Sequence, residues 1–470
     1  MPLADLLQLP ATARAIAAAV SAGSLDPVAV TREALAACEA TQTSLNALTV
    51  IDPDKALNDA ARVAIRLRAR EALPLAGVPI VVKDNIWVGG WRITQGSRYF
   101  ADHVAPRDAL CVERVRQAGA VIVAIGTCSE FACKGLTNTP LHGITRHPMD
   151  GALTPGGSSG GNSAIVAAGA VPVSVGTDGG GSSRRPPANC GLVGFKPSYG
   201  AIPHPFGFAE PFWWVTSISP IARDVADARL LFEVMAGPDG RDPESRIVTP
   251  DKAEAVQSLR LAWHPTLGLD VPVDPDVAAA CDTAILALRH AGLVIADAAP
   301  AFPSSEARSA LSAIQFAGLA AIHGERYRAA PDLIDPDVAA QIEQGFAVPA
   351  IRVAEGLEIS QLVRRALGAF FQDHDLMLSP TTPCVAWPNG LLGPERIGGK
   401  PVDSRGHAVF TPLYNHGQNP AISIPCGRGR DGLPVGLQIA GAVGEDRRVL
   451  AFASAAEAIL AKAGLWTGLP

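Results

Sequence analysis

The chain alternates short apolar runs with segments in which apolar residues recur at helical spacing. Runs of strand length lie at 77–82, 120–125 and 170–175, and a short continuous apolar run bounded by turn residues is typical of a buried strand. Residues 27–40 and 108–118 show the helical pattern instead. This alternation favours a β-sheet with helices on its faces, with 120–125 as a buried parallel strand.

The same patterning extends weakly into the later part of the chain. It predicts strands at 259–263 and 375–380 and helices at 275–291 and 359–371. Near the start, residues 1–23 are rich in alanine, but Asp5 precedes the apolar run and Arg14 interrupts it. We therefore predict a helix there and not an export signal. No run reaches about 18 apolar residues, so we expect no membrane-spanning helix.

Candidate chemistry is concentrated between residues 154 and 197, which hold two glycine-flanked serine pairs. Ser158-Ser159 follows Gly156-Gly157, and Ser182-Ser183 follows Gly179-Gly180-Gly181. Free backbone amides in such a loop suit an oxyanion hole, so a serine directly after three glycines is a candidate nucleophile. A flexible linker is the alternative, but a linker would not contain the strand-like run 170–175. The small-residue segment 158–168 is expected to be a helix whose N-terminus faces the site.

A nucleophilic serine needs a base, and the sequence offers a lysine. Neither a GxxxxGK[ST] loop nor a GxGxxG loop after a strand occurs in this stretch, which argues against a phosphate site. The nearby histidines 142, 147 and 204 have no GxSxG turn to serve. Lys83 ends the apolar run 77–82. Burial there would lower its pKa and let it accept a proton, whereas a lysine that reaches solvent from the strand end is the alternative.

These segments resemble the amidase signature family, a group of Ser–cis-Ser–Lys hydrolases. The matching pieces are GVPIVVKDN (77–85), residues 130–150, PGGSSGG (155–161), residues 176–198 and LPVGLQIAG (433–441). The resemblance implies an amidase signature fold: α/β, with a mixed central β-sheet covered on both faces by α-helices. We expect residues 1–470 to form a single amidase domain, with the signature core at about 75–200 and a variable, substrate-selecting region at about 239–370.

The resemblance also implies the roles of individual residues. Lys83, Ser158 and Ser182 would form the catalytic triad, with Ser182 as the nucleophile, Ser158 as the bridging serine and a cis peptide bond at Gly157–Ser158. The oxyanion hole would be formed by the amides of Gly179, Gly180, Gly181 and Ser182, and that loop would be supported by Asp178 and Arg184. The implied substrate contacts are Phe131, Ala132, Cys133 and Gly157. An ordinary surface ion pair is the alternative for Asp178 and Arg184.

The sequence departs from the family's pattern at two positions beside the nucleophile. Family members commonly carry a β-branched or similar residue at the position of Gly179 and an apolar one at that of Ser183. Neither change removes a catalytic group. A Cys–Glu–Lys nitrilase-type triad from Cys133, Glu130 and Lys83 or Lys134 is a further alternative, which the two intact serine motifs disfavour.

Two later features invite a substrate-binding interpretation. Residues 206–214 concentrate aromatic side chains, Trp213 and Trp214 among them, in a chain with only 5% aromatic residues. They form either a core cluster or the wall or lid of an apolar pocket. His416 precedes a predicted late strand near the cleft, where it would contact substrate or make a structural hydrogen bond.

Charge and cysteine usage limit the partners and the compartment. The 470 residues carry a net charge of −6 without a basic run, which disfavours nucleic acid and anionic membranes as partners. The eight cysteines are scattered without metal-ligand spacing, so we expect buried thiols of a cytoplasmic protein. No metal or organic cofactor is implied, and a homodimer is expected by analogy with the family alone.

Three functions are compatible with these residues. The first is an amidase that hydrolyses a C–N acyl bond of a small amide-type substrate (an aryl or alkyl amide, or a carbamate) through an acyl-enzyme. The second is the glutaminase subunit of a tRNA-dependent amidotransferase complex. The third, a catalytically dead scaffold, is disfavoured by the intact Lys83, Ser158 and Ser182.

Overall fold

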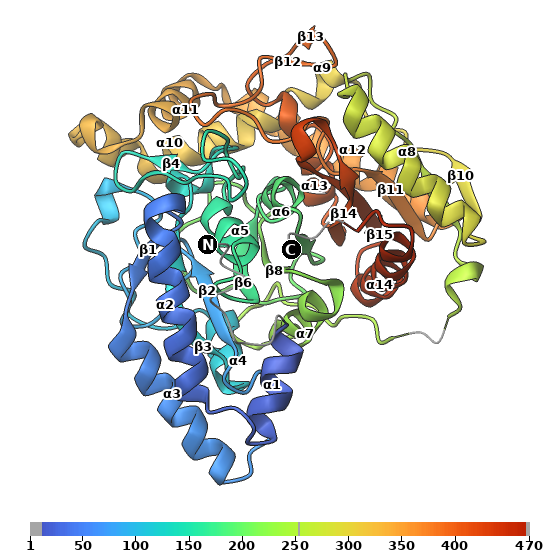
Figure 1. Cartoon of the computed structure of the whole chain (residues 1–470). Coiled ribbons are helices and arrows are strands. Elements are labelled where there is room, and N and C mark those ends of the chain that lie inside the picture. The colour runs from blue at the N-terminus through green and yellow to red at the C-terminus, as the bar shows by residue number, and fades with distance from the viewer. Residues whose placement is uncertain (1–11, 252–253, 467–470) are drawn as a thin grey trace.

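A single mixed sheet of eleven strands organises the molecule (Figure 1). The computed structural model describes residues 12–251 and 254–466. In spatial order the strands are β1 (Leu48–Ile51), β3 (Val121–Gly126), β2 (Pro79–Lys83), β6 (Val173–Asp178), β8 (Ser217–Ala222), β7 (Val193–Lys196), β14 (Ala421–Arg428), β15 (Pro434–Gly441), β11 (Leu376–Pro380), β9 (Leu261–Trp263) and β10 (Ile295–Asp297). β2 runs parallel to β3 and β6, whereas β6, β8, β7, β14 and β15 pair antiparallel in turn. The predicted fold class is confirmed.

The strands on either side of the serine loops are buried along their whole length. Every residue of β2, β3 and β6 is buried, which explains why they read as continuous apolar runs and not as alternating ones. The predicted strand at 170–175 is displaced to Val173–Asp178. Pro172 cannot donate a hydrogen bond to the sheet, while Thr177 and Asp178 pair with Ile218 and Ser217 of β8. The later predicted strands at 259–263 and 375–380 are confirmed as β9 and β11.

Helices from both halves of the chain flank this sheet (Figure 1). The first half contributes α1 (Ala13–Ser21), α2 (Pro27–Leu45), α3 (Pro53–Arg68), α4 (Leu110–Gln117), α5 (Gly160–Ala167), α6 (Arg185–Cys190) and α7 (Val225–Met235). The second half contributes α8 (Pro275–His290), α9 (Ser305–Arg308), α13 (Pro412–His416) and α14 (Asp446–Lys462), besides the three helices described below. Short hairpins join β4 (Asn138–Thr139) to β5 (Gly143–Ile144) and β12 (Arg396–Ile397) to β13 (Lys400–Pro401).

Several helices begin where the sequence provides a cap. Asp26, Asp52 and Asp224 accept hydrogen bonds from the first turns of α2, α3 and α7, and such caps satisfy amides that have no partner within the helix. The predicted helices at 27–40, 108–118 and 275–291 are confirmed as α2, α4 and α8. The helix predicted near the start is confirmed as α1, and residues 1–11 lie outside the described residues.

Three long helices cover one end of the sheet and were poorly predicted. α10 (Leu311–Ala329), α11 (Pro336–Ala347) and α12 (Ala350–Asp373) follow one another along the upper part of the view in Figure 1. The prediction covered α12 only from 359 to 371 and missed α10 and α11. α10 packs against both of its neighbours, so its buried residues are spread around the helix and no single apolar face marks it.

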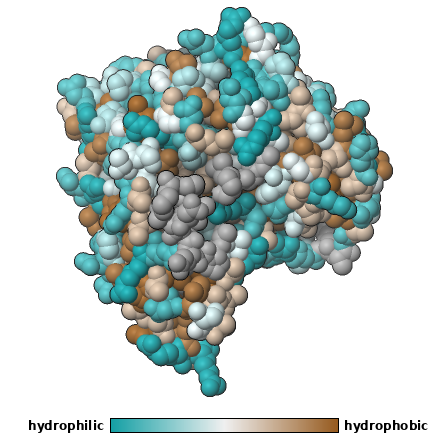
Figure 2. Space-filling view, in the orientation of Figure 1, coloured by the Kyte–Doolittle hydropathy of each residue, from teal (hydrophilic) through white to brown (hydrophobic). Residues whose placement is uncertain are grey.

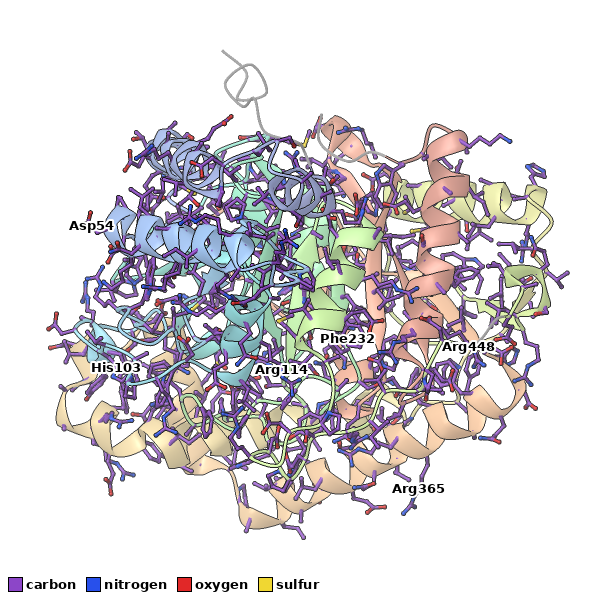
Figure 3. All side chains as sticks on the ribbon, turned by 90° about the horizontal axis from the view of Figure 1, so that it is seen from below. Asp54, His103, Arg114, Phe232, Arg365 and Arg448 are labelled. Atoms are coloured by element: carbon purple, nitrogen blue, oxygen red, sulfur yellow. The ribbon has the colours of Figure 1, made fainter. Side chains whose placement is uncertain are left out.

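The surface is mixed in polarity, and the core is aliphatic. The face drawn in Figure 2 intersperses hydrophilic and hydrophobic residues. In Figure 3, Phe232 lies on α7 inside the molecule, where it is fully buried, whereas Asp54 and Arg365 lie at its outer edge. Among residues 12–251 and 254–466, no helix combines the length and the apolar character needed to cross a bilayer.

Candidate active site

Lys83 lies at the end of β2 with its side chain completely buried. Its Nζ donates to Ser158 Oγ at 2.7 Å and to Thr177 Oγ1 at 2.8 Å. Burial penalises the ammonium form and lowers the pKa of Lys83 from 10.5 to about 8, although nearby acidic groups, Glu210 among them, oppose the shift. A substantial fraction of this lysine is therefore neutral near pH 8 and able to accept a proton.

Ser158 lies in the loop that enters α5, and its peptide bond to Gly157 is cis. The loop is closely packed: a Cβ on Gly157 would approach Leu136 N to 2.7 Å. The predicted helix 158–168 is observed as Gly160–Ala167, so both serines of the first pair precede it. Ser158 is thereby placed beside Lys83, and its neighbour Ser159 is bonded to the second serine loop.

Ser182 lies in the turn between β6 and α6 and lines a cavity. Its carbonyl accepts from Ser159 N at 3.3 Å, which joins the two serine loops. Ser182 Oγ has no hydrogen-bond partner within residues 12–251 and 254–466, while Ser158 Oγ is bonded to Lys83. Catalytic hydrogen bonds are often formed only when a substrate is bound. Of the three predicted triad residues, Ser182 lines the cavity, whereas Lys83 and Ser158 are bonded to each other outside the lining.

The three glycines before Ser182 form a sharply turned loop. Gly181 has φ +110°, and a Cβ there would lie 2.1 Å from Thr411 Oγ1, so only glycine fits. The amide of Gly181 donates to Asp178 Oδ1 at 2.7 Å. The amides of Gly179, Gly180 and Ser182 have no acceptor in the described part of the chain. Three of the four predicted oxyanion donors are therefore free.

Asp178 and Arg184 form a fully buried ion pair directly behind this loop. Arg184 donates from Nη2 to Asp178 Oδ1 at 2.9 Å and from Nε to Oδ2 at 3.0 Å. Burial alone would raise the pKa of Asp178, but Arg184 holds it well below its usual range. Arg184 also bonds Thr411 O, Asn415 Oδ1 and Gln438 Oε1. The pair therefore fixes the glycine loop to the late part of the chain and is not an ordinary surface pair.

The cavity has a volume of about 570 Å³ and opens beside Ser182. Two of the predicted substrate contacts, Ala132 and Cys133, line it. Phe131 lies instead behind the lining, stacked on His323 with 3.8 Å between ring centroids, and Gly157 contributes its carbonyl to Arg185. Burial raises the pKa of the Cys133 thiol, which disfavours the nitrilase-type alternative because the thiolate is the nucleophile.

The aromatic segment divides between the cavity and the surface. Phe212 lines the cavity, and Phe208 packs on Phe100 with 4.9 Å between ring centroids. Trp213 and Trp214 are 40% and 50% exposed and do not belong to the cavity lining. The wall function considered for the tryptophans therefore falls to Phe212. His416 lines the cavity, where it could contact a substrate, and it also makes a structural hydrogen bond between Nδ1 and Ser360 Oγ at 3.2 Å.

Several side chains that the fold brings to this site were not predicted from the sequence. Thr177 holds Lys83, and its place at the end of the 170–178 segment could have indicated this. Arg185 follows Arg184 directly in the signature segment. Gln315, Gln341 and Arg405 line the cavity from α10, α11 and the loop before α13, and the guanidinium of Arg405 donates to both glutamines. No local pattern marks these three.

The site contains side chains for acid–base and nucleophilic chemistry. Across residues 12–251 and 254–466, no cluster of three or more His, Cys, Asp and Glu side chains has metal-binding geometry. All eight cysteines are buried and unpaired. Ser182 and the amides of the glycine loop lie at the cavity, and Ser158, which is bonded to Lys83, lies in the loop that Ser159 N joins to Ser182 O. Groups of this kind can transfer an acyl group to a serine.

Comparison with known proteins decides the family. The sequence profile of the family described as Amidase matches residues 29–450. The chain belongs to the amidase family. It is a hydrolase that acts on carbon–nitrogen bonds other than peptide bonds, and the resemblance to the amidase signature enzymes is confirmed.

Relatives of this amidase include stand-alone enzymes and components of complexes. It is 34% identical to an acylamidase of Rhodococcus erythropolis, over 95% of each chain. It is 35% identical to a glutamyl-tRNA(Gln) amidotransferase subunit of Deinococcus radiodurans, over 95% of this chain and 97% of that one. Among solved structures it resembles a bacterial aryl acylamidase of the amidase signature family, with a TM-score of 0.89, 27% identity and 97% of each chain covered.

Proposed function

We propose that this amidase cleaves the C–N acyl bond of a small amide-type substrate through an acyl-enzyme on Ser182. The observation that carries the proposal is the 2.7 Å hydrogen bond between the buried Lys83 and Ser158, whose loop is bonded through Ser159 N to the carbonyl of Ser182, which lines the cavity. A buried lysine with a pKa of about 8 is a base suited to activating a serine near neutral pH.

The proton relay follows from the contacts. Neutral Lys83 takes the proton of Ser158 across their 2.7 Å contact. Ser158 in turn takes the proton of Ser182 as Ser182 Oγ attacks the substrate carbonyl. The tetrahedral intermediate then collapses, the C–N bond breaks, and the relay returns the proton to the leaving nitrogen. Water repeats the sequence to release the acid and restore Ser182.

The glycine loop supplies the electrostatic part of catalysis. Charge develops on the carbonyl oxygen in the transition state, and donors that are already in place stabilise it most. We assign this role to the free amides of Gly179, Gly180 and Ser182. Gly181 supports them, because its amide is bonded to Asp178 Oδ1 at 2.7 Å. Asp178 and Arg184 position the loop and do not touch the substrate.

The substrate range follows from the cavity and from the relatives. A volume of about 570 Å³ suits a small molecule, and its lining includes Phe212 and aliphatic side chains of α10 and α11. Aryl amides, alkyl amides and carbamates share the acyl-enzyme route. The acylamidase and aryl acylamidase relatives support the amide classes.

The alternative is that the chain releases ammonia from glutamine within a tRNA-dependent amidotransferase complex. The amidotransferase relatives, which align over nearly their whole length, favour this second candidate. We further propose that residues 1–470 form one cytoplasmic domain that can pair as a homodimer. The continuous eleven-stranded sheet, which joins strands of the signature core to β14, β15 and β11, supports the single domain.

The test is the hydrolysis of four substrates by purified wild type and by Ser182→Ala. An anilide, a primary amide, an aryl carbamate and glutamine are incubated separately, and the products are separated and quantified. We expect the wild type to cleave an amide and the variant to lose at least about 1000-fold in kcat. Equal activity of both proteins would refute Ser182 as nucleophile. Ammonia from glutamine alone, with a co-purifying partner, would favour the second candidate.

A further inference from the structure

Arg185 places a buried guanidinium at the base of the cavity, beside the nucleophile loop. Its Nη1 donates to Gly180 O and to Thr411 Oγ1, the latter at 3.3 Å, and its Nη2 donates to Gly157 O at 3.3 Å. A Cβ on Gly181 would lie 3.0 Å from Nη1. The guanidinium therefore packs against the residue that immediately precedes Ser182, between the two serine loops.

This guanidinium has unused hydrogen-bonding capacity. Arg185 is 7% exposed and lines the cavity, yet its Nε has no hydrogen-bond partner in the described part of the chain. Arginine offers five N–H donors in a fixed planar fork, and its contacts here are with two carbonyls and one hydroxyl. A buried donor without a partner is costly, and a ligand that supplies an acceptor would remove that cost.

Arg185 also has no salt bridge of its own within residues 12–251 and 254–466. Asp178 favours its charge from a distance but is paired directly with Arg184. Burial lowers the pKa of Arg185 to about 10, so the side chain remains a cation at neutral pH. Buried charges are normally paired, which makes an unpaired one at a cavity wall a candidate for a ligand of opposite charge.

The rest of the cavity adds to the positive potential. Arg308 and Arg405 also line it, and neither forms a salt bridge in the ranges described. Of the two aspartates of the lining, Asp337 pairs with Lys134, itself a lining residue, and Asp403 accepts from the backbone amide of Arg405. The cavity of this amidase therefore contains more cationic side chains than carboxylates that could pair with them.

We propose that the substrate carries a carboxylate and that Arg185 binds it, with the reacting carbonyl at Ser182 only a few bonds away. The inference rests on the proposed function and names its substrate class. A carboxylate matches the planar fork of a guanidinium, and the position of Arg185 against Gly181 requires a short link between the anionic group and the amide.

The experiment compares two 4-nitroanilides of nearly equal size. The succinyl compound carries a carboxylate, and the levulinoyl compound carries a methyl ketone in its place. The quantity measured is the ratio of their kcat/KM values. For the wild type we expect the succinyl compound to be favoured at least about tenfold. Arg185→Gln should reduce that ratio by about 10- to 100-fold, mainly through KM, because it removes a charge-assisted contact. Arg185→Lys should restore part of it.

Arg405→Gln is the matched control, since it removes a cavity arginine whose guanidinium is bonded to Gln315 and Gln341 and not to the serine loops. Its ratio should change by less than about threefold. A collapse of the ratio in this variant and not in Arg185→Gln would overturn the assignment to Arg185. Equal hydrolysis of the two anilides by the wild type would overturn the inference while leaving the amidase function intact.

Binding provides a second readout if neither anilide is cleaved. Succinamate is titrated calorimetrically into Ser182→Ala and into Ser182→Ala with Arg185→Gln. Affinity at least about tenfold weaker in the double variant would support the inference. Equal affinities, or no binding to either protein, would overturn it. Circular dichroism shows whether each variant is folded, and Arg185→Met, which also removes the charge, replaces Arg185→Gln in the comparison if the glutamine variant is not folded.

Discussion

The pKa of Lys83 can be tested directly, because the proposed reaction requires its neutral amine. The structure lowers this pKa from 10.5 to about 8, a difference of about 3 kcal/mol between the two protonation states at 1.36 kcal/mol per unit. At pH 7 about one lysine in ten would be neutral, against about one in three thousand at the unperturbed pKa. Burial thus raises the fraction of active base about 300-fold at pH 7.

The direction of the pH dependence of kcat/KM follows from the proposed role of Lys83 as a base. Below pH 8 the ammonium predominates, so kcat/KM should rise about tenfold per pH unit and level off above pH 9. The assay is kcat/KM between pH 6 and 10 with an uncharged anilide, whose own ionisation cannot contribute. An increase of about 100-fold from pH 6 to pH 9 is expected. A profile that is flat over this range, or whose midpoint lies near 6.5, would refute Lys83 as the base.

Glu210 offers a way to move that midpoint. Its carboxylate is one of the groups that raise the pKa of Lys83, and it accepts from Thr216 Oγ1 at 3.3 Å. Glu210→Gln removes the negative charge with little change of shape, so the midpoint of the profile should shift to lower pH. An unchanged midpoint would mean that Glu210 does not act on Lys83.

Three other substitutions probe the surroundings of the triad. Asp178→Asn leaves the buried Arg184 without its charged partner and should lower the free energy of unfolding by about 3–5 kcal/mol, measured by chemical denaturation. The control is Asp297→Asn, at an exposed pair with Arg289, which should change the free energy of unfolding by less than about 1 kcal/mol. Gly161→Ala would place a Cβ 2.4 Å from Ala47 O and should lower the melting temperature. Gly368→Ala on α12, where nothing lies within 4 Å of the added Cβ, should leave the melting temperature unchanged. Equal effects of the two substitutions would contradict the close packing inferred at Gly161. Phe212→Ala should alter the preference between aryl and alkyl amides, and Trp213→Ala should leave it unchanged; the reverse result would return the wall function to the tryptophans.

The parts of the fold and site that the sequence predicted depend on local chemistry. Buried strands such as β2 and β3 appear as continuous apolar runs because both of their faces are covered. The serine loops are recognisable because their glycines satisfy a backbone requirement that other residues cannot meet, as at Gly181. Lys83 was identifiable because a cation at the end of an apolar run is unusual.

The parts that could not be predicted depend on distant contacts. Two arginines stand side by side in the sequence. Arg184 was expected to support the loop together with Asp178, but only the fold shows that Arg185 faces the cavity. The two adjacent tryptophans are exposed and Phe212 is inside, although all three are aromatic. Arg405 reaches the cavity through a loop more than 200 residues after Ser182, and its sequence neighbours contain nothing that indicates this.

The three late contacts of Arg184 have a consequence for how the enzyme is made. Thr411, Asn415 and Gln438, which hold Arg184, lie 227 to 254 residues after it. A nascent chain that has emerged from the ribosome only as far as residue 400 already contains Lys83, Ser158 and Ser182, but it lacks every one of these partners. Such a chain has the reactive groups without the support that orders the glycine loop. Emergence of residues 411–438 is therefore the step that can order the glycine loop, and chains that end before residue 411 should be inert.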